Sequence, residues 1–277
     1  MAARVLRRQP REAAEDQADV RSRPSLPIPA GHPPRLGALT PHGSIRWLLL
    51  LSFAEILTML TFGNYSAALP VLRQEWGLSA AQAGMVFGAQ QIGYAAAVFV
   101  LSSLTDVIGV RKIYLLTAVW SGVMGLLFAW LADGFWPALL LRSLAGIGLA
   151  GTYVPGMRLV VEAFPGARRG AAMGIYIACF SLGIGLSLLL TGALLETGWR
   201  TAFAVTSLGP LAAAAVAWFI VRDPAGRIRR GTLALGDALR NARALRFIAA
   251  YAAHNWELFG MRAWMPAFLA AMWVGRG

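Results

Sequence analysis

The stretch GAAMGIYIACFSLGIGLSLLLTGAL, residues 170–194, contains no charged side chain. A helix rises about 1.5 Å per residue, so a stretch of this length crosses the ~30 Å hydrocarbon core of a membrane. Comparable apolar blocks occupy residues 45–69, 79–104, 112–132, 136–158, 200–221 and 245–273. Only helices and closed barrels satisfy their backbone polar groups in lipid. The sequence therefore predicts an all-α integral membrane protein with seven transmembrane helices.

The composition of the 277-residue chain excludes several other classes of protein. Apolar side chains make up 57% and charged ones 14%, whereas soluble domains carry about 25% charged residues. The single cysteine, Cys179, lies in an apolar block, which excludes a disulfide framework and a cysteine zinc site. No cluster has the spacing of a nucleophilic or metal-dependent catalytic site outside the apolar blocks. We therefore expect that the protein is not an enzyme and has no cofactor and no metal site.

The net charge of +12 reflects topology rather than a nucleic-acid partner. Basic residues concentrate in the first 43 residues and in the segments after the second, fourth and sixth apolar blocks. The opposite ends of the blocks hold only Arg73, Arg200 and Arg276. Because cytoplasmic loops of membrane proteins are enriched in Lys and Arg, we expect a multi-pass protein of the bacterial inner membrane with a cytoplasmic N-terminus.

The loop between the second and third blocks reads SSLTDVIGVRK, residues 102–112. It resembles the signature loop of the major facilitator superfamily, which it matches at Asp106, Gly109 and Arg111. Ser102, Val107 and Val110 depart from that pattern. With Lys112, the three matching residues are expected to form a cytoplasmic gating loop, in which Asp106 and the cations pair with neighbouring helix ends in one conformation.

Two further motifs extend this resemblance over nearly all of residues 45–222. Arg142 followed by Gly146 and Gly148 is similar to the fourth-helix motif of the superfamily, and the segment 198–203 is similar to the start of its sixth helix. The fifth-helix Gly-Pro motif of drug antiporters is absent, because no proline lies between Cys179 and Gly192. This absence disfavours a proton/drug antiporter of the same superfamily, which stays an alternative.

A distant likeness within the superfamily points to the cyanate and nitrate/nitrite permeases. Nitrate porters rely on an arginine in the second helix, whereas this second block offers only glutamines. Nitrate itself is therefore disfavoured as the substrate.

The segment GIGLAG, residues 146–151, also matches the G-x-G-x-x-G pattern of dinucleotide-binding proteins. No strand precedes it and no acidic residue follows at the required distance, so that interpretation is disfavoured. We expect Gly146, Gly148 and Gly151 to let neighbouring helices pack closely.

Ionisable residues inside membrane spans are costly and usually face a cavity or a partner. Glu55, Arg142 and Glu257 lie deep in the first, fourth and seventh blocks, and the superfamily resemblance implies that these helices line a central cavity. Tyr153 shares the helical face of Arg142, and Arg262 follows Glu257 nearer the outside. These five residues are candidates for substrate binding or proton coupling. The alternative is a buried structural role, in which Arg142 anchors nearby backbone carbonyls.

The resemblance also implies a domain organisation, because the superfamily has two halves that are parallel repeats. We expect a disordered basic tail at 1–43, an N-terminal six-helix half at 44–222, a central cytoplasmic loop at 223–244, and helix 7 of a truncated second half at 245–277. The expected partners are the lipid bilayer, a small-molecule substrate and the missing C-terminal half, with no nucleic acid.

The resemblance implies a secondary transporter that moves a small solute by alternating access. Arginine and glutamate in the expected cavity suit a small organic anion with proton coupling. A non-transporting membrane scaffold or remnant is the alternative function.

Overall fold

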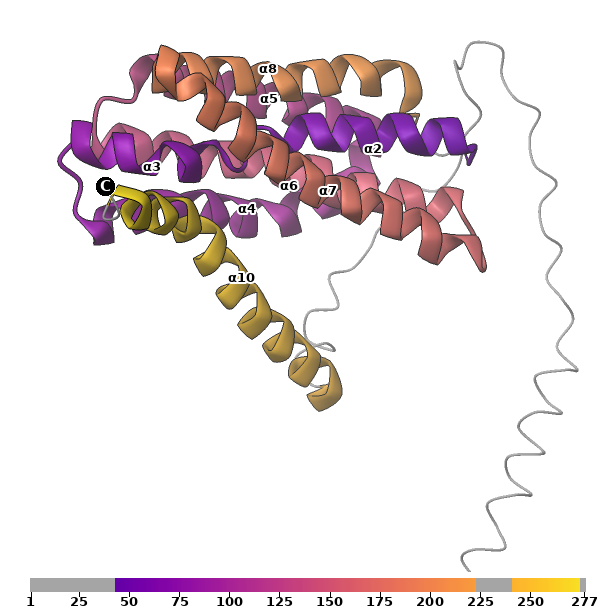
Figure 1. Ribbon diagram of the computed structural model, residues 1–277. Helices are drawn as coiled ribbons and strands as arrows, with labels where there is room; N and C mark the ends of the chain where they lie inside the picture. Colours follow the sequence, from indigo (N-terminus) through magenta and orange to yellow (C-terminus); the bar gives the residue numbers. More distant parts are fainter. Residues whose placement is uncertain (1–42, 223–240, 275–277) are drawn as a thin grey trace, which may run out of the picture. The chain divides into compact units, whose positions relative to one another are not determined.

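The computed structural model describes residues 43–222 and 241–274, which belong to one compact unit spanning Ala38–Gly277. The tail expected at 1–43 and the central loop expected at 223–244 fall almost wholly outside the described residues. Every regular element that is described is helical (Figure 1): α2 Ile45–Met59, α3 Asn64–Glu75, α4 Ala80–Ile108, α5 Val110–Leu131, α6 Phe135–Ala163, α7 Arg168–Leu194, the short 3-10 helix η2 Leu195–Thr197, α8 Trp199–Ile220 and α10 Ala242–Val274.

Six helical spans of the described chain are long and apolar enough to cross a membrane. They are α2 with α3 as one span, α4, α5, α6, α7 with η2, and α8. The seventh expected helix is α10, which is 33 residues long. It is not among these six apolar spans and carries Glu257 and Arg262 in its middle. The all-α membrane fold predicted from the sequence is confirmed. It has six apolar spans and a seventh helix, α10, that is more polar than they are.

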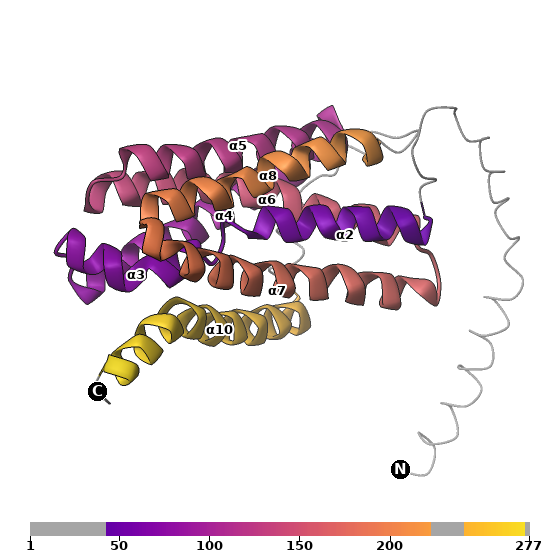
Figure 2. The same cartoon turned by 45° about the horizontal axis from the view of Figure 1, so that its top comes forward.

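The first span is broken, which differs from the single helix expected over 45–69. The helix α2 ends at Met59 and α3 begins at Asn64, and the two lie end to end (Figures 1 and 2). The backbone N–H of Gly63 donates to Ser187 Oγ of α7 over 3.1 Å, and the same hydroxyl donates to the carbonyl of Leu60. A side chain from α7 therefore satisfies backbone groups that the break releases, as an apolar surrounding requires.

Two glycines bring neighbouring helices into close contact with α2 just before the break. A Cβ on Gly183 of α7 would lie 2.6 Å from the Cβ of Met59 and 2.8 Å from the carbonyl oxygen of Ile56. A Cβ on Gly209 of α8 would overlap the carbonyl oxygen of Leu57. The missing side chains allow α7 and α8 to pack directly on the α2 backbone.

The buried core contains two large apolar clusters, a small third one around Met59 and Phe62, and a belt of polar residues. One cluster lies toward the end where α3 and α4 join, and its large members are Tyr65, Leu69, Phe128, Leu141, Trp199 and Phe203. The other surrounds the start of α2 and includes Trp47, Leu51, Tyr114, Leu159, Tyr176 and Ile220. Between them, along α2–α3, α6, α7 and α8, lie the buried polar residues of the belt: Glu55, Thr58, Asn64, Arg142, Ser187, Thr206 and Ser207.

The spans differ in how much of their surface the described helices cover. Only 17% of the most apolar part of α4 and 22% of that of α7 is buried, compared with at least 50% in the other four spans. The helices α4 and α7 therefore present the largest uncovered faces of this six-helix unit.

The close approach of α7 to α2 makes a direct prediction about stability. In Gly183→Val the new side chain meets Met59 and Ile56, and overpacking of this kind costs about 1–3 kcal/mol. Gly185→Val, two residues further on α7, is the matched control, because a Cβ there meets no atom within 4 Å. Thermal unfolding of the purified protein in detergent should show a lower melting temperature for Gly183→Val than for Gly185→Val. Equal melting temperatures would contradict the close α2–α7 contact.

Candidate functional site

Glu55 is a fully buried carboxyl group in the polar belt. The Tyr176 hydroxyl donates to its Oε2 over 2.7 Å, and the Thr58 hydroxyl lies 3.5 Å from the same oxygen. The other oxygen, Oε1, has no hydrogen-bond partner among the described residues, and no ion pair to Glu55 occurs there. Burying a carboxylate without a cation is unfavourable. This arrangement suits an acid that gains and loses a proton.

Arg142 reaches the break in the first span from α6 and is only 3% exposed. Its Nη1 donates to the Asn64 Oδ1 over 3.1 Å and to the Thr61 carbonyl over 3.4 Å. The guanidinium carbon lies 5.2 Å from the ring centre of Tyr65, within the range of a cation–π contact. Arg142 therefore contacts the break itself at Thr61 and the start of α3 at Asn64.

Asn64 connects the same break to a third helix. Its Nδ2 donates to the Thr206 hydroxyl of α8 over 3.2 Å, while its Oδ1 accepts from Arg142. With Ser187 on α7, side chains from α6, α7 and α8 converge on the segment between Leu60 and Asn64.

The space beside the Arg142 guanidinium is small. The cavity has a volume of about 10 Å³, which is room for about one water molecule. Its lining comes from the break and from α5, α6 and α8: Thr61, Asn64, Ser121, Met124, Gly125, Phe128, Leu141, Arg142, Ala145 and Phe203. The Nε and Nη2 atoms of Arg142 are buried and have no partner among the described residues. The cavity is too small for an organic anion to reach them in this conformation.

Tyr153 lies on α6 next to the residue that binds Glu55. Its half-buried ring is nearly parallel to that of Tyr176, with ring centres 6.2 Å apart and an interplanar angle of 12°. The ring centre of Phe180 lies 4.7 Å from that of Tyr153. The structure thus places Tyr153 one residue away from the buried carboxyl.

The two candidates on α10 do not join this group. Glu257 is exposed and Arg262 is half-buried. In the described ranges, no hydrogen bond or ion pair links either of them to Glu55 or Arg142. The helix itself packs beside the break, because the ring of Phe259 lies 6.1 Å from that of Phe62.

The three glycines of α6 lie where neighbouring helices approach. A Cβ on Gly146 would overlap the carbonyl oxygen of Gln90 on α4. On Gly148 and Gly151 it would overlap the side chains of Ser121 and Thr117 on α5. The helix α6 continues through Pro155 and Gly156 without a break.

The expected gating loop contains an ion pair with α6. The Asp106 Oδ1 accepts from Arg158 Nη1 over 2.6 Å, and Arg158 Nε donates to Glu162 over 2.9 Å. Gly109 joins α4 to α5 with a φ of 95°, a conformation that favours glycine. The end of α4 is thereby tied to the end of α6.

The cations that follow Gly109 have different surroundings. Arg111 Nη2 donates to the carbonyl of Trp218 over 2.8 Å, and its guanidinium carbon lies 4.7 Å from the Trp218 ring centre. Lys112 is exposed. Arg111 thus binds the C-terminal end of α8, where cations are favourable.

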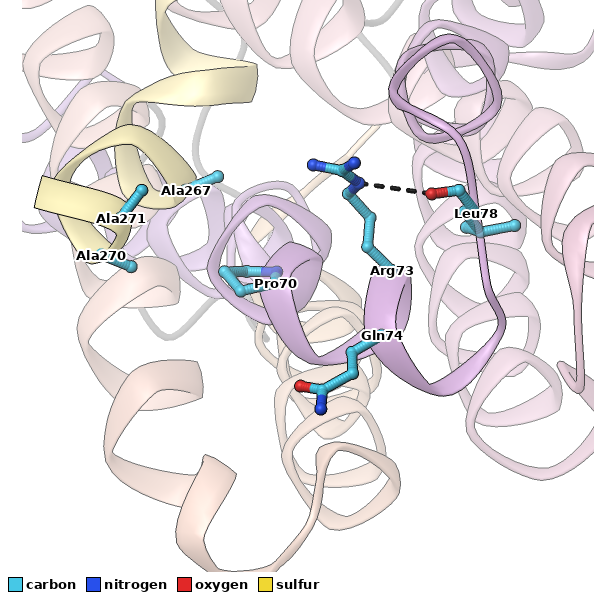
Figure 3. A pocket seen from close by; sticks show the side chains of 7 residues that line it. All are labelled: Pro70, Arg73, Gln74, Leu78, Ala267, Ala270 and Ala271. Carbon is cyan, nitrogen blue, oxygen red and sulfur yellow. Dashed lines mark hydrogen bonds between the residues drawn. The ribbon is translucent and has the colours of Figure 1, made fainter. Parts of the chain in front are cut away.

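A second, larger cavity lies away from Glu55, between α3 and α10. This outer groove has a volume of about 600 Å³ and is lined by Pro70, Arg73, Gln74, Leu78, Ala267, Ala270 and Ala271 (Figure 3). Arg73 Nε donates to the Leu78 carbonyl over 3.4 Å. Its volume is in the range of small-molecule sites, and Arg73 is the cation that lines it.

Sequence reasoning missed Tyr176, Asn64, Ser187 and Thr206. The hydrogen bonds Tyr176–Glu55, Ser187–Gly63 and Asn64–Thr206 each join residues more than a hundred positions apart in the chain, so no local spacing connects them. The sequence offered only a weak signal for these four residues, namely that each is a polar side chain within an apolar span.

Comparison with known proteins gives a consistent family assignment. A hexuronate transporter of Bacillus subtilis is 26% identical over 80% of this chain and 56% of its own length. A nitrate/nitrite transporter of Picosynechococcus is 33% identical, but over 49% of this chain and 25% of its own length. The likeness to the nitrate/nitrite branch is therefore weak.

A solved structure shows the same fold. It is a bacterial homolog of the human lysosomal transporter Spinster, inward-facing and unoccupied, with a TM-score of 0.67 and 22% identity over 83% of this chain and 56% of that chain. The chain spans about half the length of the curated relatives it matches. The family model of the Major Facilitator Superfamily matches residues 51–274, and the chain belongs to this superfamily.

Proposed function

We propose that this chain is the first half, with helix 7, of a secondary transporter that moves a small organic anion together with a proton. The observation that carries the proposal is the buried Glu55 carboxyl, which has a hydroxyl donor but no cation partner in the described chain. Such a group can exchange a proton without breaking an ion pair. We assign proton binding to Glu55.

The missing partner in this proposal is a second half of the same protein. The relatives are about twice as long as the segment that matches them, and α4 and α7 have large uncovered faces. We place the N-terminal half at 44–222, the central loop at 223–244 and the start of the second half at 245–277. The concentration of arginines on one side supports a cytoplasmic N-terminus in the inner membrane.

The proposed substrate is a small carboxylate. A hexuronate is the substrate named for one relative, and the outer groove holds Arg73, which favours an approaching anion. Arg142 has a different role in this proposal, because its cavity is too small for an organic anion. We assign it to holding the break between α2 and α3.

Alternating access requires contacts that can open. The Arg158 and Asp106 side chains of the cytoplasmic ion pair are 41% and 22% exposed, and partly exposed pairs are worth only about 0–1 kcal/mol. The pair can therefore close one conformation and release in another at small energetic expense, as a gating contact needs.

Removing the acid of Glu55 tests the proton-coupled mechanism. Glu55→Gln keeps the shape of the side chain but cannot carry a proton, so we expect it to lose accumulation driven by a proton gradient and to keep exchange of substrate for substrate. Both are measured by uptake of labelled hexuronates and other small carboxylates into liposomes that contain the protein together with its second half.

Glu196→Gln serves as the control, because Glu196 is an exposed carboxylate in η2, at the end of the α7 span. Wild-type accumulation in Glu55→Gln would contradict the assigned role. No transport of any anion by the wild-type protein would favour the scaffold alternative.

Arg142→Lys separates the structural role from a substrate role. A lysine ammonium cannot reproduce the planar contacts with Thr61, Asn64 and the Tyr65 ring. We expect the variant to lose about 1–3 kcal/mol of unfolding free energy and to keep the KM of the wild type. Thermal unfolding and transport kinetics check this, and a raised KM with unchanged stability would show that Arg142 binds substrate.

A further inference from the structure

Tyr176 is the main hydrogen-bond partner of the Glu55 side chain. Its hydroxyl lies 2.7 Å from Oε2, whereas the Thr58 hydroxyl lies 3.5 Å from that oxygen and binds the Glu55 backbone carbonyl at 2.8 Å. Both side chains of the Tyr176–Glu55 pair are fully buried. Loss of the Tyr176 hydroxyl would leave the carboxyl with the long Thr58 contact alone among the described residues.

The Tyr176 hydroxyl occupies space that a side chain on α6 would fill. A Cβ built on Gly156 overlaps the hydroxyl oxygen and lies 2.9 Å from Cζ of the ring. The same Cβ is 3.6 Å from the Tyr114 ring of α5. The backbone of α6 at Gly156 therefore forms the wall against which the hydroxyl is placed.

The Tyr176 ring has little freedom to turn away. Tyr153 of α6 lies nearly parallel to it, with ring centres 6.2 Å apart, and the ring itself has no exposed surface. The direction of the hydroxyl is thus set by α6 on one side and by Glu55 of α2 on the other.

We propose that Tyr176 is the positioning residue of the Glu55 carboxyl, and that Gly156 is required because only a residue without a side chain leaves room for the Tyr176 hydroxyl. The transport part of this inference rests on the proposed proton coupling at Glu55. Tyr176 of α7 links Gly156 of α6 to Glu55 of α2. In this proposal the position of α6 controls the surroundings of the acid.

The first experiment is a double-mutant cycle, measured by transport in liposomes that contain the protein and its second half. Tyr176→Phe should lose proton-driven accumulation while it keeps substrate exchange, as Glu55→Gln does. Because Tyr176 acts through Glu55, adding Tyr176→Phe to Glu55→Gln should leave exchange at the level of Glu55→Gln alone. Tyr114→Phe is the matched control, since the Tyr114 hydroxyl is also fully buried but has no described partner.

Wild-type accumulation in Tyr176→Phe would overturn the positioning role while the function of Glu55 stands. An additional loss of exchange in the double variant would also overturn it, because that result indicates a separate structural role for Tyr176.

The second experiment does not depend on transport and uses this chain purified in detergent. Gly156→Ala should lower the melting temperature, and most of that loss should disappear in Gly156→Ala/Tyr176→Phe, where the hydroxyl no longer meets the new methyl group. Gly174→Ala on α7 is the control, because a Cβ there meets no atom within 4 Å. If the losses from Gly156→Ala and Tyr176→Phe simply add, the proposed contact is wrong, whether or not the protein couples transport to protons.

Discussion

Lipid offers no hydrogen bonds to a polypeptide backbone, and the broken first span depends on this constraint. Between Met59 and Asn64 the helix stops, and the released backbone groups need partners from inside the protein. Ser187 binds the N–H of Gly63 and the carbonyl of Leu60, and Arg142 binds the carbonyl of Thr61. The break is therefore a place where hydrogen bonds tie α6 and α7 to the first span.

The same polar belt explains why Glu55 is distinctive. Asn64, Ser187 and Thr206 use their side chains to bind the break or one another, and Arg142 binds the break through Nη1. The carboxyl of Glu55 instead meets a tyrosine hydroxyl, and one of its oxygens has no described partner. A buried acid without a counter-ion is costly for stability, so its presence is better explained by a function that uses its proton than by a contribution to the fold.

The sequence was sufficient for the class of fold because apolar length is a local property. Apolar blocks of about 20 residues predict spans, and Asp106 at the end of α4 pairs with Arg158 of the neighbouring α6. The break at 60–63 could not be predicted, because Gly63 breaks the helix only where Ser187 of a distant span can bind it. For the same reason the sequence pointed to Glu55 and Arg142 but not to Tyr176, and it grouped Glu257 with them although that residue is exposed on α10.

The most direct test of the central claim, that Glu55 carries the transported proton, is to measure proton movement during uptake. Liposomes with the protein and its second half receive an organic anion that the protein accumulates. A pH-sensitive dye reports the pH of the outside medium. We predict that the medium becomes more alkaline as the wild-type protein takes up the anion, and that Glu55→Gln exchanges the anion without this change. Uptake by the wild type with no change of pH, or an unchanged pH response in Glu55→Gln, would contradict the claim.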